Sequence, residues 1–128
     1  MTEANKKSAA GMVGEAKERI ENLTVEQVAA EVEKGQALLV DLRDSEELRL
    51  NGVIPNAIHV SRGMLEFRAD PTSPYHREEF DPNRRTILYC ASGGRSALAA
   101  DTLESMGYED VAHLDGGFKD WKESGNSV

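Results

Sequence analysis

Residues 86–107 of this 128-residue chain read TILYCASGGRSALAADTLESMG. The first five residues form a short, mostly apolar run, which is typical of a strand covered on both faces. Four small residues, ASGG, follow as a loop, and a helix is predicted from about Arg95 to Met106, with Gly107 at its end. A buried strand that passes through a tight loop into a helix is typical of α/β proteins with a parallel sheet.

The same alternation extends from this unit in both directions along the chain. Thr24 and Gln27 have the spacing of a capping box, so a helix is predicted to begin at Thr24 and to end at Gly35. Further strands are predicted at residues 37–42, 57–60 and 110–114, and further helices at residues 14–22, 45–52, 63–68 and 116–124. Strands that alternate with helices predict an α/β domain with a mostly parallel sheet.

The length suits one ordinary domain and is too short for two. Hydrophobic residues make up 39% of the chain, which is enough to build a core. Residues 1–13 are small and polar and show no periodicity, so we expect them to form a mobile N-terminal tail. Residues 14–128 are expected to form a single domain.

The formal net charge is -8 and the pI is near 4.9. An acidic surface repels the phosphates of nucleic acids and of anionic membranes, so neither is expected as a partner. No stretch approaches the roughly 20 apolar residues that span a bilayer, and the N-terminus lacks the apolar run of a secretory signal. One cysteine cannot form an intramolecular disulfide. We therefore expect a soluble, cytoplasmic protein, and nothing in the sequence demands more than a monomer.

Neither a cofactor nor a metal site is predicted. His59, His76 and His113 are scattered over strands and a loop, which does not suit zinc binding. Asp115 and the two glycines after it precede a helix, but no P-loop lysine or dinucleotide-binding glycine motif accompanies them.

Cys90 is the last residue of its predicted strand, at the edge where open parallel sheets bind ligands. The glycines of ASGG permit a tight turn with inward N–H groups, and the next helix adds N–H donors and partial positive charge at its N-terminus. Such surroundings lower thiol pKa values to about 3.5–7.5, from about 8.5 for a free thiol. Arg95 adds a positive charge at the rim. A buried structural thiol beside an ordinary turn is the alternative, but this combination favours a reactive thiolate.

Four segments, in order along the chain, resemble the motifs of the rhodanese (sulfurtransferase) family. They are LLVDLRDSEEL (38–48), GVIPNAIHV (52–60), CASGGRS (90–96) and LDGGFKDWKESG (114–125). The third is similar to the Cys-x-x-Gly-x-Arg-Ser active-site loop of that family. The fourth is similar to its closing Leu-x-Gly-Gly-x-x-x-Trp-x-x-x-Gly helix. The resemblance covers about residues 22–125, which is nearly all of the chain outside the predicted tail.

This resemblance implies a rhodanese-like α/β fold, with a five-stranded, mostly parallel sheet flanked by helices on both faces and with ENL (21–23) as an edge strand. It implies a sulfurtransferase in which Cys90 takes a sulfane sulfur from a small anionic donor such as thiosulfate. The resulting persulfide would yield its sulfur to cyanide or to a thiol, including a thiol on a protein. The residues implied to bind the substrate are Ala91, Ser92, Gly93, Gly94, Arg95 and Ser96.

Three further expectations concern residues outside the loop. Asp41 and Arg43 match family positions that support the site, although a surface ion pair is an equally good interpretation of them. The stretch 61–83 is irregular and longer than in the smallest family members, and we expect residues 61–80 to lie near the loop. There, unless they are simply solvated, the following side chains would shape the acceptor site: Arg62, Glu66, Arg68 or His76.

Two other functions compete with sulfur transfer. Phosphatases and arsenate reductases of related fold use Cys-x5-Arg, whereas Cys90 and Arg95 form a Cys-x4-Arg loop, which suits a single sulfur atom better than a phosphoryl group. A non-catalytic binding module is the second alternative, but inactive relatives usually lose the cysteine, and this chain keeps it.

Overall fold

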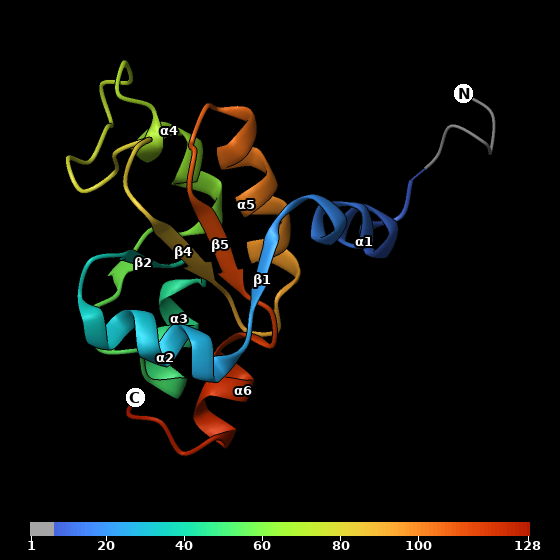
Figure 1. The fold of residues 1–128 in the computed structure, drawn as a ribbon, viewed down its shortest axis with the longest axis vertical. Helices are drawn as coiled ribbons and strands as arrows, with labels where there is room; N and C mark the ends of the chain where they lie inside the picture. Colours follow the sequence, from blue (N-terminus) through green and yellow to red (C-terminus); the bar gives the residue numbers. More distant parts are fainter. Residues whose placement is uncertain (1–6) are drawn as a thin grey trace.

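Five short strands form one sheet in which every neighbouring pair is parallel. They lie in the order β1-β5-β4-β2-β3 in a computed structural model that describes residues 7–128 (Figure 1). Their bounds are β1 Glu21–Leu23, β2 Leu38–Asp41, β3 Ile58–His59, β4 Thr86–Tyr89 and β5 Val111–Leu114. Because β4 is the central strand, Cys90 leaves the sheet at the middle of its carboxyl edge.

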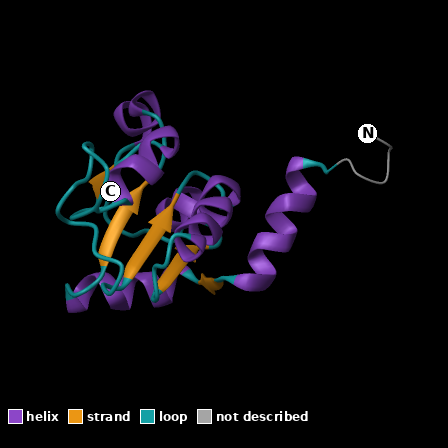
Figure 2. Ribbon diagram, turned by 90° about the horizontal axis from the view of Figure 1, so that it is seen from above, coloured by secondary structure: helices purple, strands orange, loops and turns teal. Residues whose placement is uncertain are grey.

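Helices cover both faces of this sheet (Figure 2). Their bounds are α1 Ala9–Arg19, α2 Val25–Lys34, α3 Ser45–Asn51, α4 Leu65–Ala69, α5 Gly94–Ser105 and α6 Gly117–Glu123, and the 3₁₀ turn η2, Arg62–Met64, leads into α4. Alternate strand residues face opposite sides. Val40 and Leu88 belong to the core beneath α1, α4 and α5, whereas Leu39 and Ile87 belong to the core beneath α2 and α6. The predicted fold is therefore confirmed, including the edge strand β1.

The signals at the ends of α2 act as expected. The side chain of Thr24 accepts a hydrogen bond from the Gln27 N–H at 3.2 Å, and the side chain of Gln27 accepts one from the Thr24 N–H at 2.8 Å. Gly35 ends the helix with φ 71°, in the left-handed region that glycine adopts without strain.

The N-terminal helix differs from the prediction at both ends. It begins at Ala9, with Ser8 as its cap, so residues 9–13 of the predicted tail are helical, while residues 1–6 of that tail lie outside the described residues. It ends at Arg19 because the next residues pair with β5. Packing explains the earlier start: α1 lies against α5, and Ala16 is fully buried in the core.

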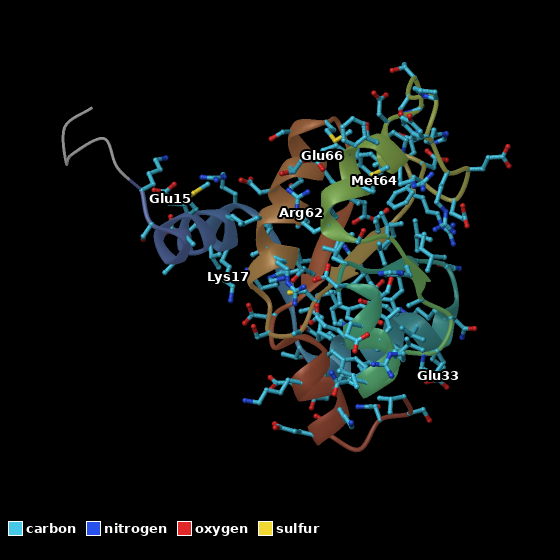
Figure 3. All side chains as sticks on the ribbon, turned by 180° about the vertical axis from the view of Figure 1, so that it is seen from behind. Glu15, Lys17, Glu33, Arg62, Met64 and Glu66 are labelled. Atoms are coloured by element: carbon cyan, nitrogen blue, oxygen red, sulfur yellow. The ribbon has the colours of Figure 1, made fainter. Side chains whose placement is uncertain are left out.

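Part of the segment after β3 does not lie where it was expected. Figure 1 shows residues 70–83, in yellow-green, at the end of the sheet opposite the loop that follows β4. The chain before them packs along α5, and Figure 3 shows Arg62 beside this helix. The Arg62 guanidinium lies 3.5 Å from the Thr102 hydroxyl of α5. The hydroxyl of Tyr108, just after α5, donates to the Ala69 carbonyl at 2.7 Å.

The four candidate side chains of this segment interact within it. Arg62 forms an ion pair with Glu66 at 2.8 Å, Arg68 donates to the Tyr75 carbonyl at 3.2 Å, and His76 bonds the Phe80 carbonyl at 3.1 Å. For residues 70–80, the expected position beside the loop was therefore wrong, whereas a role of Arg62, Glu66 or Arg68 at an acceptor site stays a prediction. The buried apolar residues of the segment, Leu65, Ala69 and Phe80, belong to the core that α5 covers.

Candidate active site

The sulfur of Cys90 sits inside the turn that joins β4 to α5. Its Sγ atom accepts hydrogen bonds from the backbone N–H groups of Gly93 at 3.2 Å and Ser96 at 3.4 Å, and the residue is only 1% exposed. Gly93 makes this turn with φ 100°. Of the other predicted binding residues, Ser92 is exposed on the loop and Gly94 begins α5. The backbone therefore aims two N–H donors at the sulfur.

Two glycines, Gly93 and Gly117, let this loop pack tightly against the loop between β5 and α6. A Cβ on Gly93 would lie 2.1 Å from the Asp115 carbonyl oxygen, and one on Gly117 would lie 2.4 Å from the Ala91 carbonyl oxygen. The N-terminus of α6 meets the Cys90 and Ala91 carbonyls, which accept hydrogen bonds at 2.8 Å and 3.1 Å. The motif LDGG, distant in sequence, is therefore part of the support for the cysteine loop.

Arg95 is held by a partner that the sequence did not indicate. Its two terminal nitrogens lie 2.8 and 3.0 Å from the two carboxylate oxygens of Glu47 on α3. The hydrogen bonds to Arg95 lower the pKa of Glu47 to about 2, and the same bonds raise the pKa of Arg95. Because Glu47 balances the guanidinium, the attraction of the loop for an anion depends chiefly on its N–H groups.

Asp41 and Arg43 form a buried ion pair, so the surface interpretation was wrong. Each side chain is 1% exposed, and the guanidinium contacts the two carboxylate oxygens at 2.9 and 2.6 Å. The Tyr89 hydroxyl donates to the same carboxylate at 2.6 Å, and burial followed by this hydrogen bond raises the pKa of Tyr89. The guanidinium also lies 4.0 Å from the ring centroid of Phe118. These contacts tie β2, β4 and α6 together beside the cysteine loop.

A buried polar chain that motif reasoning missed connects Cys90 to the edge of the sheet. The Ser96 hydroxyl lies 3.5 Å from Cys90 Sγ and 2.8 Å from His113 Nδ1, and His113 Nε2 lies 2.7 Å from Asn22 Oδ1. Burial lowers the pKa of His113 to about 4, so the imidazole is neutral near pH 7. A predicted register between β1 and β5 would have revealed this contact, because pairing of the two strands places Asn22 beside His113.

The buried imidazole of His113 makes stability depend on pH. Its folded-state pKa lies below the value of about 6.5 for a free imidazole, so the unfolded chain takes up this proton first as the pH falls. The free energy of unfolding is expected to fall between pH 6.5 and pH 4 by up to about 3 kcal/mol. Urea unfolding at several pH values between 6.5 and 4 measures this fall. A His113→Leu variant that loses as much stability as wild type over this window would contradict the assignment.

A pocket of about 270 Å³ lies beside the loop. Ala91 contributes to it from the loop, and Phe118, Lys119 and Lys122 contribute from α6. Arg43, Glu47, Asn51 and Glu123 also line it. The pocket therefore offers cationic side chains next to the cysteine loop, although the chain as a whole is acidic.

Within residues 7–128, no helix is long and apolar enough to cross a membrane.

Comparison with known proteins gives one matching family model and several similar structures. The model, described as the rhodanese-like domain, matches residues 24–124. A Rhodopseudomonas palustris protein of unknown function, described as a possible tyrosine phosphatase, is 39% identical with a TM-score of 0.92, covering 100% of this chain and 98% of its own.

Two further structures match at lower identity. The human single-domain sulfurtransferase TSTD1 is 25% identical with a TM-score of 0.70, covering 80% of this chain and 95% of its own. An uncharacterised protein from Saccharomyces cerevisiae is 28% identical with a TM-score of 0.69, covering 83% of this chain and 93% of its own. With the fold and the ordered motifs, these matches establish that this chain belongs to the rhodanese-like domain family.

Proposed function

We propose that this protein is a sulfurtransferase that carries a sulfane sulfur as a persulfide on Cys90. The observation that carries the proposal is the position of Cys90 Sγ, which accepts hydrogen bonds from the N–H groups of Gly93 and Ser96. Donors held in place by the backbone stabilise an anionic sulfur without having to reorganise during the reaction. Similarity to a human sulfurtransferase supports the same assignment.

The proposed reaction consists of two displacements. The Cys90 thiolate attacks the outer sulfur of thiosulfate, so a new S–S bond forms while the original S–S bond breaks and sulfite leaves with its electron pair. A thiolate or cyanide then attacks the outer sulfur of the persulfide. The Cys90 thiolate leaves with the electron pair of that bond, and the two steps balance without an oxidant.

The pocket beside Ala91 is where we place the small anionic donor. Lys119 and Lys122 of α6 bring two cations to the pocket, next to a loop whose own arginine is already paired with Glu47. These lysines would attract the donor electrostatically, and they would also stabilise the negative charge of the sulfite as the S–S bond breaks.

Phosphate-ester hydrolysis is the second candidate, because the Rhodopseudomonas palustris structure is described as a possible tyrosine phosphatase. Two features count against it. The loop has four residues between Cys90 and Arg95, one fewer than phosphatases of related fold use. Arg95 would also have to give up its bidentate pair with Glu47 to hold a phosphoryl group.

Parallel assays of the purified protein separate these functions. With thiosulfate and cyanide we expect thiocyanate to form at a rate that Cys90→Ser reduces to background, whereas p-nitrophenyl phosphate should not be hydrolysed above that background. Hydrolysis that depends on Cys90, in the absence of sulfur transfer, would overturn the proposal in favour of a phosphatase. Absence of both activities in a folded protein would favour a binding module.

A further inference from the structure

The hydrogen bonds of Asn22 determine where the proton of His113 lies. The Asn22 amide nitrogen donates to the Lys17 carbonyl at 2.9 Å and to the Ile20 carbonyl at 3.2 Å, which fixes the orientation of this amide. Its oxygen therefore faces His113 Nε2 at 2.7 Å and must accept a hydrogen bond from it. Since the imidazole is neutral, Nε2 carries its only proton and Nδ1 presents a lone pair.

The same reasoning assigns the hydroxyl proton of Ser96. Because His113 Nδ1 is an acceptor, the Ser96 hydroxyl must be the donor across their 2.8 Å contact. The Gly93 carbonyl is the other acceptor within reach, but it lies farther away, at 3.3 Å. A hydroxyl has a single proton, so the side that Ser96 turns toward Cys90 Sγ, at 3.5 Å, consists of lone pairs.

We propose that His113 and Asn22 are positioning residues that hold the Ser96 hydroxyl proton away from the Cys90 sulfur. The thiol can then donate its S–H to Ser96, while an anionic sulfur is left with two backbone N–H donors, those of Gly93 and Ser96. His113 thereby withholds a third hydrogen-bond donor from an anionic sulfur. This role rests on the proposed function, because the sulfur of Cys90 is the proposed carrier. The test of the role requires only that Cys90 can be alkylated.

Two charged groups flank the contacts that link Cys90, Ser96, His113 and Asn22, and each has an ion-pair partner. Asp115 lies 3.6 Å from His113 Nε2 but forms a 2.8 Å ion pair with Lys17 of α1. On the other side of the loop, Arg95 is paired with Glu47. Because Asp115 and Arg95 each have a partner of opposite sign, the direction of the Ser96 hydroxyl is what sets the number of hydrogen bonds that an anionic sulfur accepts.

The first test follows the alkylation of Cys90 by iodoacetamide as a function of pH. In His113→Leu, the released Ser96 hydroxyl can donate to the thiolate, so the midpoint of the pH–rate curve should fall by about one unit, a tenfold change in thiolate fraction. The shift should disappear when the same replacement is made in a Ser96→Ala background, where no hydroxyl remains to be released. A midpoint that does not fall in folded His113→Leu, or an equal fall in both backgrounds, would overturn the proposal.

A second test uses the unaltered protein, so it does not depend on whether a variant folds. Nitrogen-15 NMR of the labelled imidazole distinguishes a ring nitrogen that carries a proton from one that does not. At neutral pH we expect the His113 proton on Nε2 and a bare Nδ1, and a proton on Nδ1 would refute the assignment. Neither test involves a sulfur donor, so the inference can fail while sulfur transfer stands, and the reverse is equally possible.

Discussion

Replacing Arg43 with methionine is expected to lower the free energy of unfolding by about 3–5 kcal/mol, because removing one partner leaves the other charge buried and uncompensated. The unpaired group would be Asp41, which is 1% exposed and would keep only the hydrogen bonds from the Tyr89 hydroxyl and the backbone N–H of residue 43. The substitution also removes the hydrogen bond that Arg43 donates to the Gly52 carbonyl at 2.9 Å. Urea unfolding at neutral pH measures the loss.

The matched control is Arg49→Met, which breaks the exposed pair between Arg49 and Glu46. Their side chains are 66% and 65% exposed, and exposed pairs contribute only about 0–1 kcal/mol. A second variant, Asp41→Asn with Arg43→Met, removes both charges and should recover part of the loss. Equal, small losses for the two single variants would show that the ion pair of Asp41 does not stabilise the site.

Replacing Gly93 with alanine is expected to disrupt the cysteine loop. The new Cβ would lie 2.1 Å from the Asp115 carbonyl oxygen, and alanine would have to adopt φ 100°, where a residue with a side chain is strained. The strain alone costs about 1–3 kcal/mol, and the backbone must also shift to relieve the clash. That shift moves the Gly93 N–H away from Cys90 Sγ, so persulfide formation should fall at least about tenfold with the loss of one charge-assisted hydrogen bond.

The neighbouring glycine supplies the control for this change. A Cβ on Gly94 meets only Val13 Cγ2, at an ordinary 3.9 Å, and Gly94 does not have a positive φ. The free energy of unfolding of Gly94→Ala should therefore lie within about 0.5 kcal/mol of the wild-type value. Thermal and urea unfolding of the two variants measure this contrast. If Gly93→Ala were as stable as Gly94→Ala and formed the persulfide equally well, neither stability nor persulfide formation would require the close packing of the two loops.

Much of the fold could be predicted from local patterns. Short apolar runs identified the buried strands, because both faces of a parallel sheet are covered, and the helix ends carried their own signals at Thr24 and Gly35. The edge strand β1 is only three residues long, too short for periodicity to reveal, and it was predicted only from family resemblance. The early start of α1 was missed because it results from packing against α5.

The site could be predicted only where its parts are adjacent in sequence. Cys90 and the loop residues form one contiguous motif, so their proximity needed no tertiary information. The pairing of Arg95 with Glu47 spans 48 positions, and the contact of His113 with Asn22 spans 91, so both depend on the order of strands and helices. The burial of Asp41 was equally hidden, since a charged pair two residues apart reads the same on a surface as in a core.

Intact-mass spectrometry of the protein after incubation with thiosulfate tests the proposed persulfide most directly. We expect that the wild-type chain gains the mass of one sulfur atom, that cyanide or a thiol removes it, and that Cys90→Ser gains nothing. If the folded wild-type chain takes up no sulfur from thiosulfate or from a persulfide donor, or if Cys90→Ser takes it up equally well, Cys90 is not a sulfur carrier.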